Sequence, residues 1–179
     1  PELRPGQVFV LARKREPLRQ LSTALTAAGI PHAAPEETRL IEAPAVRDLL
    51  ALLDALASPG HDLSLAQALV SPLFGVEEDE LLRLAAAAGR IAYLDAPVAD
   101  TPRPWWAAVQ SLPSPSPALA RAQRLLADWQ AAATRSTPHE LLDRIVHEGE
   151  LLPRLLASSP PTEAGARVQS VQALLRAAL

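Results

Sequence analysis

The sequence predicts a mainly α-helical fold with a small β element near its start. Alanine and leucine fill 67 of the 179 positions, whereas the chain has only 2 Phe and 1 Tyr. Ala and Leu lead the scale of helix propensity, while aromatic and β-branched residues favour strands. Hydrophobic residues make up 49% of the chain, so a sizeable core can form within one domain or two small ones. We therefore do not expect an all-β sandwich.

The first predicted element is a strand over about residues 7–12, where the apolar run is continuous rather than alternating. Such a run is typical of a strand covered on both faces in a parallel α/β sheet. After it, Glu16 and Pro17 open a predicted helix, and Gly29 is placed to close it in the left-handed conformation. A possible short second strand lies at about 31–41. Because a lone parallel strand is not stable, we expect sheet partners elsewhere.

From Ala45 onward, apolar residues recur at helical spacing and predict a series of helices. Asp62 is a candidate N-cap for one helix, and the acidic run 77–80 fits the first turn of another, where the helix dipole favours negative charge. Thr137 and Glu140 fit a capping box. Residues 96–117 hold six prolines and predict an irregular crossing with one short helix after Pro104. The predicted helices cover about 45–57, 62–70, 77–88, 119–133, 137–149 and the residues from 163.

The composition and the motifs limit the kinds of binding and catalysis that we expect of this chain. The net charge of −3 argues against strong autonomous binding to a phosphate backbone. The absence of cysteine excludes disulfides and thiol catalysis and fits a cytoplasmic protein, which is the expected location. The sequence contains no GxxxxGK[ST] or GxSxG motif and no His pair at metal-ligand spacing. We therefore expect no self-contained active site, no metal and no bound cofactor. No apolar run approaches the ~20 residues of a membrane span, so no membrane contact is expected.

Three segments in the first 85 residues form an ordered series. The first is Val10-Leu11-Ala12-Arg13, followed by spaced leucines and Gly29-Ile30-Pro31; the second is residues 41–53; the third is residues 69–75, before the acidic run. In order and spacing, these segments resemble the second motor domain of superfamily 1 DNA helicases of the UvrD/RecB type. The resemblance is closest to AddA- and RecB-like helicase–nuclease subunits, and it extends more weakly through the rest of the chain.

The resemblance implies a domain organisation. Residues 1–54 would be a partial second RecA-like motor segment, with the motif IV strand and the helices after it. Residues 55–179 would be the inserted helical subdomain, truncated before motif V, so the chain is expected to be a piece of a longer protein. Both Walker motifs would then lie upstream, outside this sequence.

The resemblance also implies a function. The parent would be an ATP-dependent DNA helicase acting in DNA unwinding, double-strand-break repair and recombination, with an exonuclease domain as a further candidate part. ATP and Mg²⁺ would bind the parent, and this piece alone would be inactive. The implied partners are DNA, through the full-length parent, the other motor domain of the same chain, and a helicase–nuclease partner subunit.

Arg13 is the candidate catalytic residue. It follows the predicted strand directly, and ligands of open α/β sheets lie beyond the carboxyl ends of strands. In the family, the matching arginine reaches the γ-phosphate of ATP, and a planar, permanently charged fork suits the charge on a transferring phosphoryl group. The alternative interpretation is an arginine that caps a surface strand end.

Four further residues are weaker candidates for DNA binding. Arg15 and Arg19 belong to a basic patch after the predicted strand, although such charges are commonly just solvated. Trp105 and Trp106 could stack on unpaired bases. Large apolar residues between prolines are alternatively core anchors for a loop.

The segment after Ser71 has two interpretations. Related helicases have a glycine-flanked turn near here that approaches duplex phosphates, but in this sequence Gly75 is followed by the four acids of the run 77–80, which would repel DNA. The alternative is that Phe74 anchors a loop and Gly75 supplies its turn. For the whole chain, the alternative to a helicase piece is a free-standing helical interaction module without catalysis.

Overall fold

The computed structural model describes residues 8–30, 32, 40–92 and 98–179. The chain divides into two compact units, Pro1–Thr38 and Arg39–Leu179. The described residues are mainly helical, as the composition predicts, and none of them is in a strand. The boundary expected at 54/55 came from the family resemblance and falls inside a helix of the second unit.

The first unit contains α1 (Arg15–Ala27). This helix ends as predicted: Gly29 has a φ of 67°, and the backbone N–H of Ile30 bonds back to the carbonyl of Leu25 at 2.9 Å. The predicted strand over 7–12 is not present in residues 8–12. A strand needs a neighbour for its backbone hydrogen bonds, and the described residues supply none. The predicted second strand over 31–41 lies mostly outside the described residues, and its last two residues begin η2, a 3₁₀-helix (Leu40–Glu42).

The second unit is built from short helices whose positions the hydrophobic periodicity largely predicts. One of them was not predicted: α8 follows α7 after only two residues, and its N-cap, Glu150, is not a residue type preferred at that position and makes no side-chain cap hydrogen bond. The helices are α2 (Pro44–Ala57), α3 (Asp62–Val70), α4 (Glu78–Ala87), α5 (Trp105–Ser111), α6 (Pro117–Ala133), α7 (Pro138–Glu148), α8 (Leu151–Ser158) and α9 (Pro161–Ala177).

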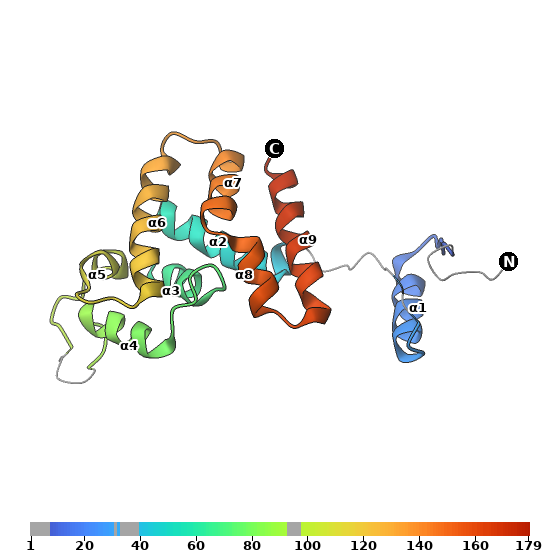
Figure 1. The fold of residues 1–179 in the computed structure, drawn as a ribbon, viewed down its shortest axis with the longest axis horizontal. Helices are drawn as coiled ribbons and strands as arrows, with labels where there is room; N and C mark the ends of the chain where they lie inside the picture. The colour runs from blue at the N-terminus through green and yellow to red at the C-terminus, as the bar shows by residue number, and fades with distance from the viewer. Residues whose placement is uncertain (1–7, 31, 33–39, 93–97) are drawn as a thin grey trace. The chain divides into compact units, whose positions relative to one another are not determined.

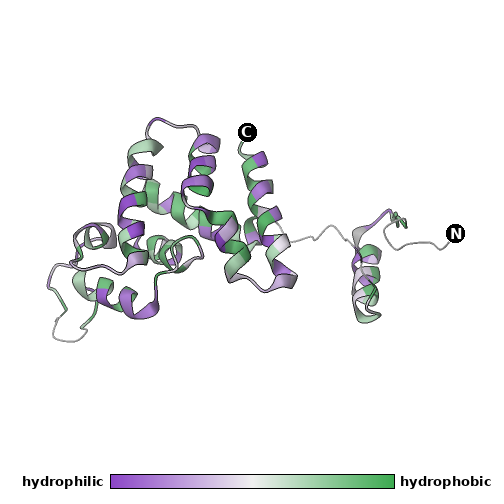
Figure 2. Ribbon diagram, in the orientation of Figure 1, coloured by the Kyte–Doolittle hydropathy of each residue, from purple (hydrophilic) through white to green (hydrophobic). Residues whose placement is uncertain are grey.

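Helix α2 is the centre of this unit and packs on α3, α6 and α9. Figure 1 shows α6 and α7 side by side, with α3, α4 and α5 gathered at one end and α8 leading into α9. The helices carry hydrophobic residues along one side and polar residues along the other (Figure 2). The apolar sides form one core, in which Trp129, Leu52 and Leu126 are fully buried. Burial of this core is the main force that holds the short helices together.

Helix starts are fixed partly by local caps and partly by distant side chains. Thr137 and Glu140 form the predicted capping box at the start of α7. Asp62, predicted as the N-cap of α3, is instead its first residue, and its Oδ1 accepts the backbone N–H of Trp105 at 2.8 Å. The carboxylate of Asp62 therefore satisfies an otherwise unpaired N–H at the start of α5 rather than at the start of its own helix.

None of the helices in the described ranges is both long and apolar enough to cross a bilayer.

Candidate functional site

Arg13 lies on a bend just before the first turn of α1, and its side chain is exposed. The four residues 8–11 that precede the bend are all large and hydrophobic, and they too are exposed: Phe9 is 89% and Leu11 95% accessible. Exposed apolar side chains in a continuous run are unfavourable in water, and they mark a segment suited to burial against another surface. The guanidinium of Arg13 thus follows an uncovered apolar segment.

The other two arginines of the basic patch differ from Arg13. Arg15 is the first residue of α1. Arg19, one turn further on, donates two hydrogen bonds to Glu16, from Nε at 3.1 Å and from Nη2 at 2.8 Å. These hydrogen bonds lower the pKa of the Glu16 carboxyl below its ordinary value. Because Glu16 neutralises it locally, Arg19 is less suited than Arg13 to contact a phosphate.

Trp105 and Trp106 open α5 in the second unit, and both are half-buried against the hydrophobic core. The backbone N–H of Trp105 is held by Asp62, whose other carboxylate oxygen accepts a hydrogen bond from Nη2 of Arg90 at 2.6 Å. This packing matches the interpretation of the two rings as loop anchors. A ring that packs on the core has only part of its surface left for stacking on a base.

The segment after Ser71 has the geometry of a structural turn. Gly75 supplies the turn: it has a left-handed conformation with a φ of 67°, and its backbone N–H bonds to the carbonyl of Ser71 at 2.8 Å. Phe74 is 2% exposed, and its ring centroid lies 5.9 Å from that of Trp129. Phe74 therefore anchors the loop in the core. Of the acids that follow, Glu80 is buried.

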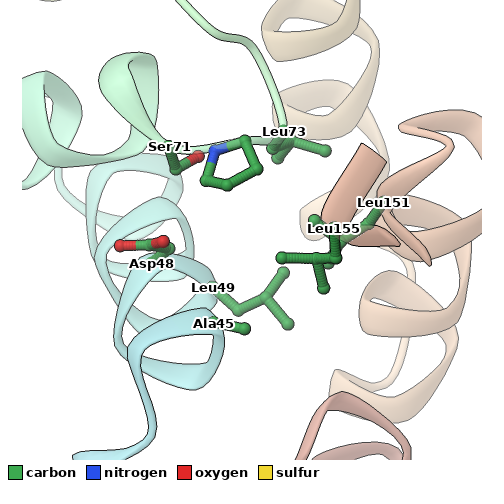
Figure 3. A pocket seen from close by; sticks show the side chains of 8 residues that line it. Ala45, Asp48, Leu49, Ser71, Leu73, Leu151 and Leu155 are labelled. Atoms are coloured by element: carbon green, nitrogen blue, oxygen red, sulfur yellow. The ribbon is translucent and has the colours of Figure 1, made fainter. Parts of the chain in front are cut away.

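A small cavity lies between α2, the loop after α3, and α8 (Figure 3). Its volume of about 10 Å³ suffices for one water molecule and is far below the several hundred Å³ of a small-molecule site. Asp48 and Ser71 are its polar lining residues. Burial raises the pKa of the Asp48 carboxyl above its ordinary value, and a 3.2 Å hydrogen bond from Nε2 of Gln67 acts in the opposite sense. We find no site for a metabolite here.

The structure brings together one set of basic residues that the sequence did not single out. Arg121 of α6 donates hydrogen bonds from Nη1 to the carbonyl of Leu73 at 2.6 Å and from Nη2 to that of Gly149 at 2.7 Å. Burial lowers the pKa of Arg121, and the nearby charges of Arg154 and Arg124 lower it further. Spacing along α6 predicts that Arg121 and Arg124 are neighbours, but Arg154 joins them only through the tertiary fold.

The candidate residues therefore form no single composite site within either unit. Arg13, Arg15 and Arg19 belong to Pro1–Thr38, and the two tryptophans belong to Arg39–Leu179. In the described part of the chain, no group of three acidic or histidine side chains is placed to hold a metal ion.

No protein-family model matches this chain, and no curated protein matches its sequence.

Proposed function

We propose that this chain is part of an ATP-dependent DNA helicase of the UvrD/RecB type, contributing a segment of the second motor and its inserted helical subdomain. The observation that carries the proposal is the ordered series of three segments, residues 10–31, 41–53 and 69–75. Each segment alone is common, whereas their order and spacing together are specific. The proposal extends to a parent that acts in double-strand-break repair and recombination, in the cytoplasm.

The exposed segment 8–11 supports this proposal. Its large hydrophobic side chains are 54% to 95% accessible, and a sheet in the longer protein would bury them. We infer that residues 7–12 become a strand there, and that residues within 31–41 form a second one. Backbone pairing would satisfy the N–H and C=O groups of the segment while its side chains are buried.

Arg13 would then stand at the carboxyl end of that strand, where ligands of parallel sheets bind. Its role would be to donate hydrogen bonds to phosphate oxygens of ATP as negative charge develops on them. The Walker motifs that hold ATP and Mg²⁺ would lie in the other motor. An arginine that reaches across the cleft also couples nucleotide binding to closure of the two motors.

The helices of residues 55–179, the part assigned to the inserted subdomain, support the proposal through their packing. They share one hydrophobic core with α2 within the compact unit Arg39–Leu179. An inserted subdomain needs such a core to move as a body. In the parent, this unit would contact duplex DNA or a helicase–nuclease partner subunit.

The coding sequence around this chain provides the first test. The proposal expects a GxxxxGK[ST] motif upstream and a motif-V-like segment downstream of Leu179. If neither motif is found, the alternative of a free-standing helical interaction module replaces the helicase.

A biochemical test uses the longer protein, in which DNA should stimulate ATP hydrolysis. In that protein, the variant Trp106→Ala distinguishes the two interpretations of the Trp106 ring, as an anchor in the core or as a stacking surface for an unpaired base. We expect it to reduce stability with little change in DNA affinity, because Trp106 packs on the core. A large loss of DNA affinity in a folded variant would instead assign Trp106 to the DNA contact.

A further inference from the structure

We propose that Arg121, Arg124 and Arg154 form a binding site for a phosphate-class oxyanion where the start of α6 meets the loop before α8. This proposal does not rest on the proposed helicase function, because side-chain geometry in the second unit carries it. The shared chemistry is a tetrahedral group with negative charge, supplied either by free phosphate or by the backbone of a nucleic acid.

The first argument is the local charge. Nη2 of Arg121 and Nη2 of Arg154 lie beside the same carboxylate oxygen of Glu150, and Arg124 lies one turn along α6 from Arg121. Three positive charges therefore face one negative charge, in a chain whose overall net charge is negative. Such a local excess attracts an anion even where the whole molecule does not.

The second argument is that the ion pairs with Glu150 are loose. Its Oε2 lies 3.9 Å from Nη2 of Arg121 and 3.5 Å from Nη2 of Arg154, beyond the usual length of a charge-assisted hydrogen bond. The side chain of Glu150 is 65% exposed. Its backbone has a φ of 49°, a left-handed conformation that costs free energy in a non-glycine residue. Glu150 is thus a weakly held anion that an external one can displace.

The third argument is that Arg154 has hydrogen-bond donors without an acceptor. Among the described residues, no side-chain hydrogen bond forms from Arg154, and its Nε is buried without an acceptor. Most of the other arginines of the second unit, including Arg90, Arg103 and Arg144, donate to a carboxylate or carbonyl. Arg121 is anchored by its two carbonyl acceptors and keeps the cluster in place. An oxyanion would supply acceptors for the exposed ends of Arg124 and Arg154.

The test titrates inorganic phosphate into the full 179-residue chain at constant ionic strength, with backbone amide NMR shifts as the readout. We expect saturable shifts at the start of α6 and around residues 149–154, with an affinity in the millimolar range, roughly as for an exposed arginine site. Arg124→Gln and Arg154→Gln should each weaken binding by about 3- to 10-fold. Arg121 is left unchanged, because its loss would free two carbonyls and threaten the fold.

Two further variants sharpen the test. Glu150→Gln should tighten phosphate binding by about 3-fold or more, since it removes the competing carboxylate. Arg176→Gln removes a positive charge from α9, as Arg124→Gln and Arg154→Gln do from the site, and should leave binding unchanged. A competition arm adds a short DNA duplex: displacement of the duplex by phosphate identifies a nucleic-acid backbone as the source, whereas phosphate binding without duplex binding identifies a free phosphate group. Linear, non-saturating shifts, or equal binding by wild type, Arg124→Gln and Arg154→Gln, would overturn the proposal.

Discussion

Glu80 and Ser116 are 36 residues apart in the chain, and the buried carboxylate of Glu80 accepts hydrogen bonds from both the backbone N–H and the hydroxyl of Ser116. The N–H bond measures 2.7 Å. The same hydroxyl accepts the N–H of Leu119 and caps α6. A single acidic side chain thus joins the first turn of α4 to the start of α6, which explains why one of four consecutive acids is buried.

Removal of this carboxylate should destabilise the fold. We expect Glu80→Ala to lower the free energy of unfolding by about 2–3 kcal/mol, because two half-buried donors of Ser116 lose a charged acceptor. Urea denaturation of the full chain measures the change. Glu78→Ala, an exposed position in the same turn, should cost less than about 1 kcal/mol. Equal losses in the two variants would mean that the Glu80–Ser116 contact adds no stability.

Gly149 should not tolerate a side chain, although its φ of −76° is available to any residue. A Cβ there would lie 2.4 Å from the carbonyl oxygen of Ile145 and 2.5 Å from Cδ1 of Leu73. We expect Gly149→Ala to destabilise the chain by about 1–3 kcal/mol through this overpacking.

Gly165 provides the matched control, because a Cβ at this position in α9 meets nothing within 4 Å. Gly165→Ala should raise the free energy of unfolding by about 0.5–1 kcal/mol, since alanine has the higher helix propensity. Thermal unfolding of both variants measures the contrast, and a stable Gly149→Ala would contradict the close packing of α7 on the loop after α3.

Asp48 and Asp54 of α2 should titrate in opposite directions from their ordinary values. Burial raises the pKa of Asp48, whereas hydrogen bonds from Ser64 and His61 lower the pKa of Asp54. NMR titration of the two carboxyl carbons in the full chain should therefore show Asp48 gaining its proton at the higher pH. The reverse order would refute the burial of Asp48 beside the cavity.

The same shifts predict the pH dependence of stability. The folded chain binds the Asp48 proton more tightly than the unfolded chain, so this contribution is present below the unfolded pKa of about 4 and is lost as pH rises through the folded pKa. As the pH rises through the folded pKa of Asp48, the variant Asp48→Asn should therefore become more stable relative to wild type. Asp54→Asn should show the opposite trend, because the contribution of Asp54 is present above about pH 4 and is lost on acidification.

The sequence predicted the elements that local chemistry determines. Hydrophobic spacing located most helices, Gly29 took the left-handed conformation expected of it, and Thr137 formed its capping box. Elements that depend on distant residues were not predictable in this way. Asp62 and Glu80 cap helices other than their own, which no local pattern reveals.

The strand prediction over 7–12 was drawn from a continuous apolar run, and residues 8–12 lack the pairing that a strand requires. For the candidate site, Arg13 was singled out by its position directly after an apolar run and by the family resemblance, and in the structure its side chain is exposed. The association of Arg154 with Arg121 was not visible, because it depends on how α8 folds back after Glu150.

ATP hydrolysis by Arg13→Ala in the longer protein, measured with saturating DNA, tests the central claim most directly. Lys14→Ala is the control, because it removes the same charge from the next exposed residue. The account predicts a loss of about 10³-fold in turnover for Arg13→Ala with unfolding behaviour unchanged, and near wild-type turnover for Lys14→Ala. Wild-type turnover in a folded Arg13→Ala variant would contradict it.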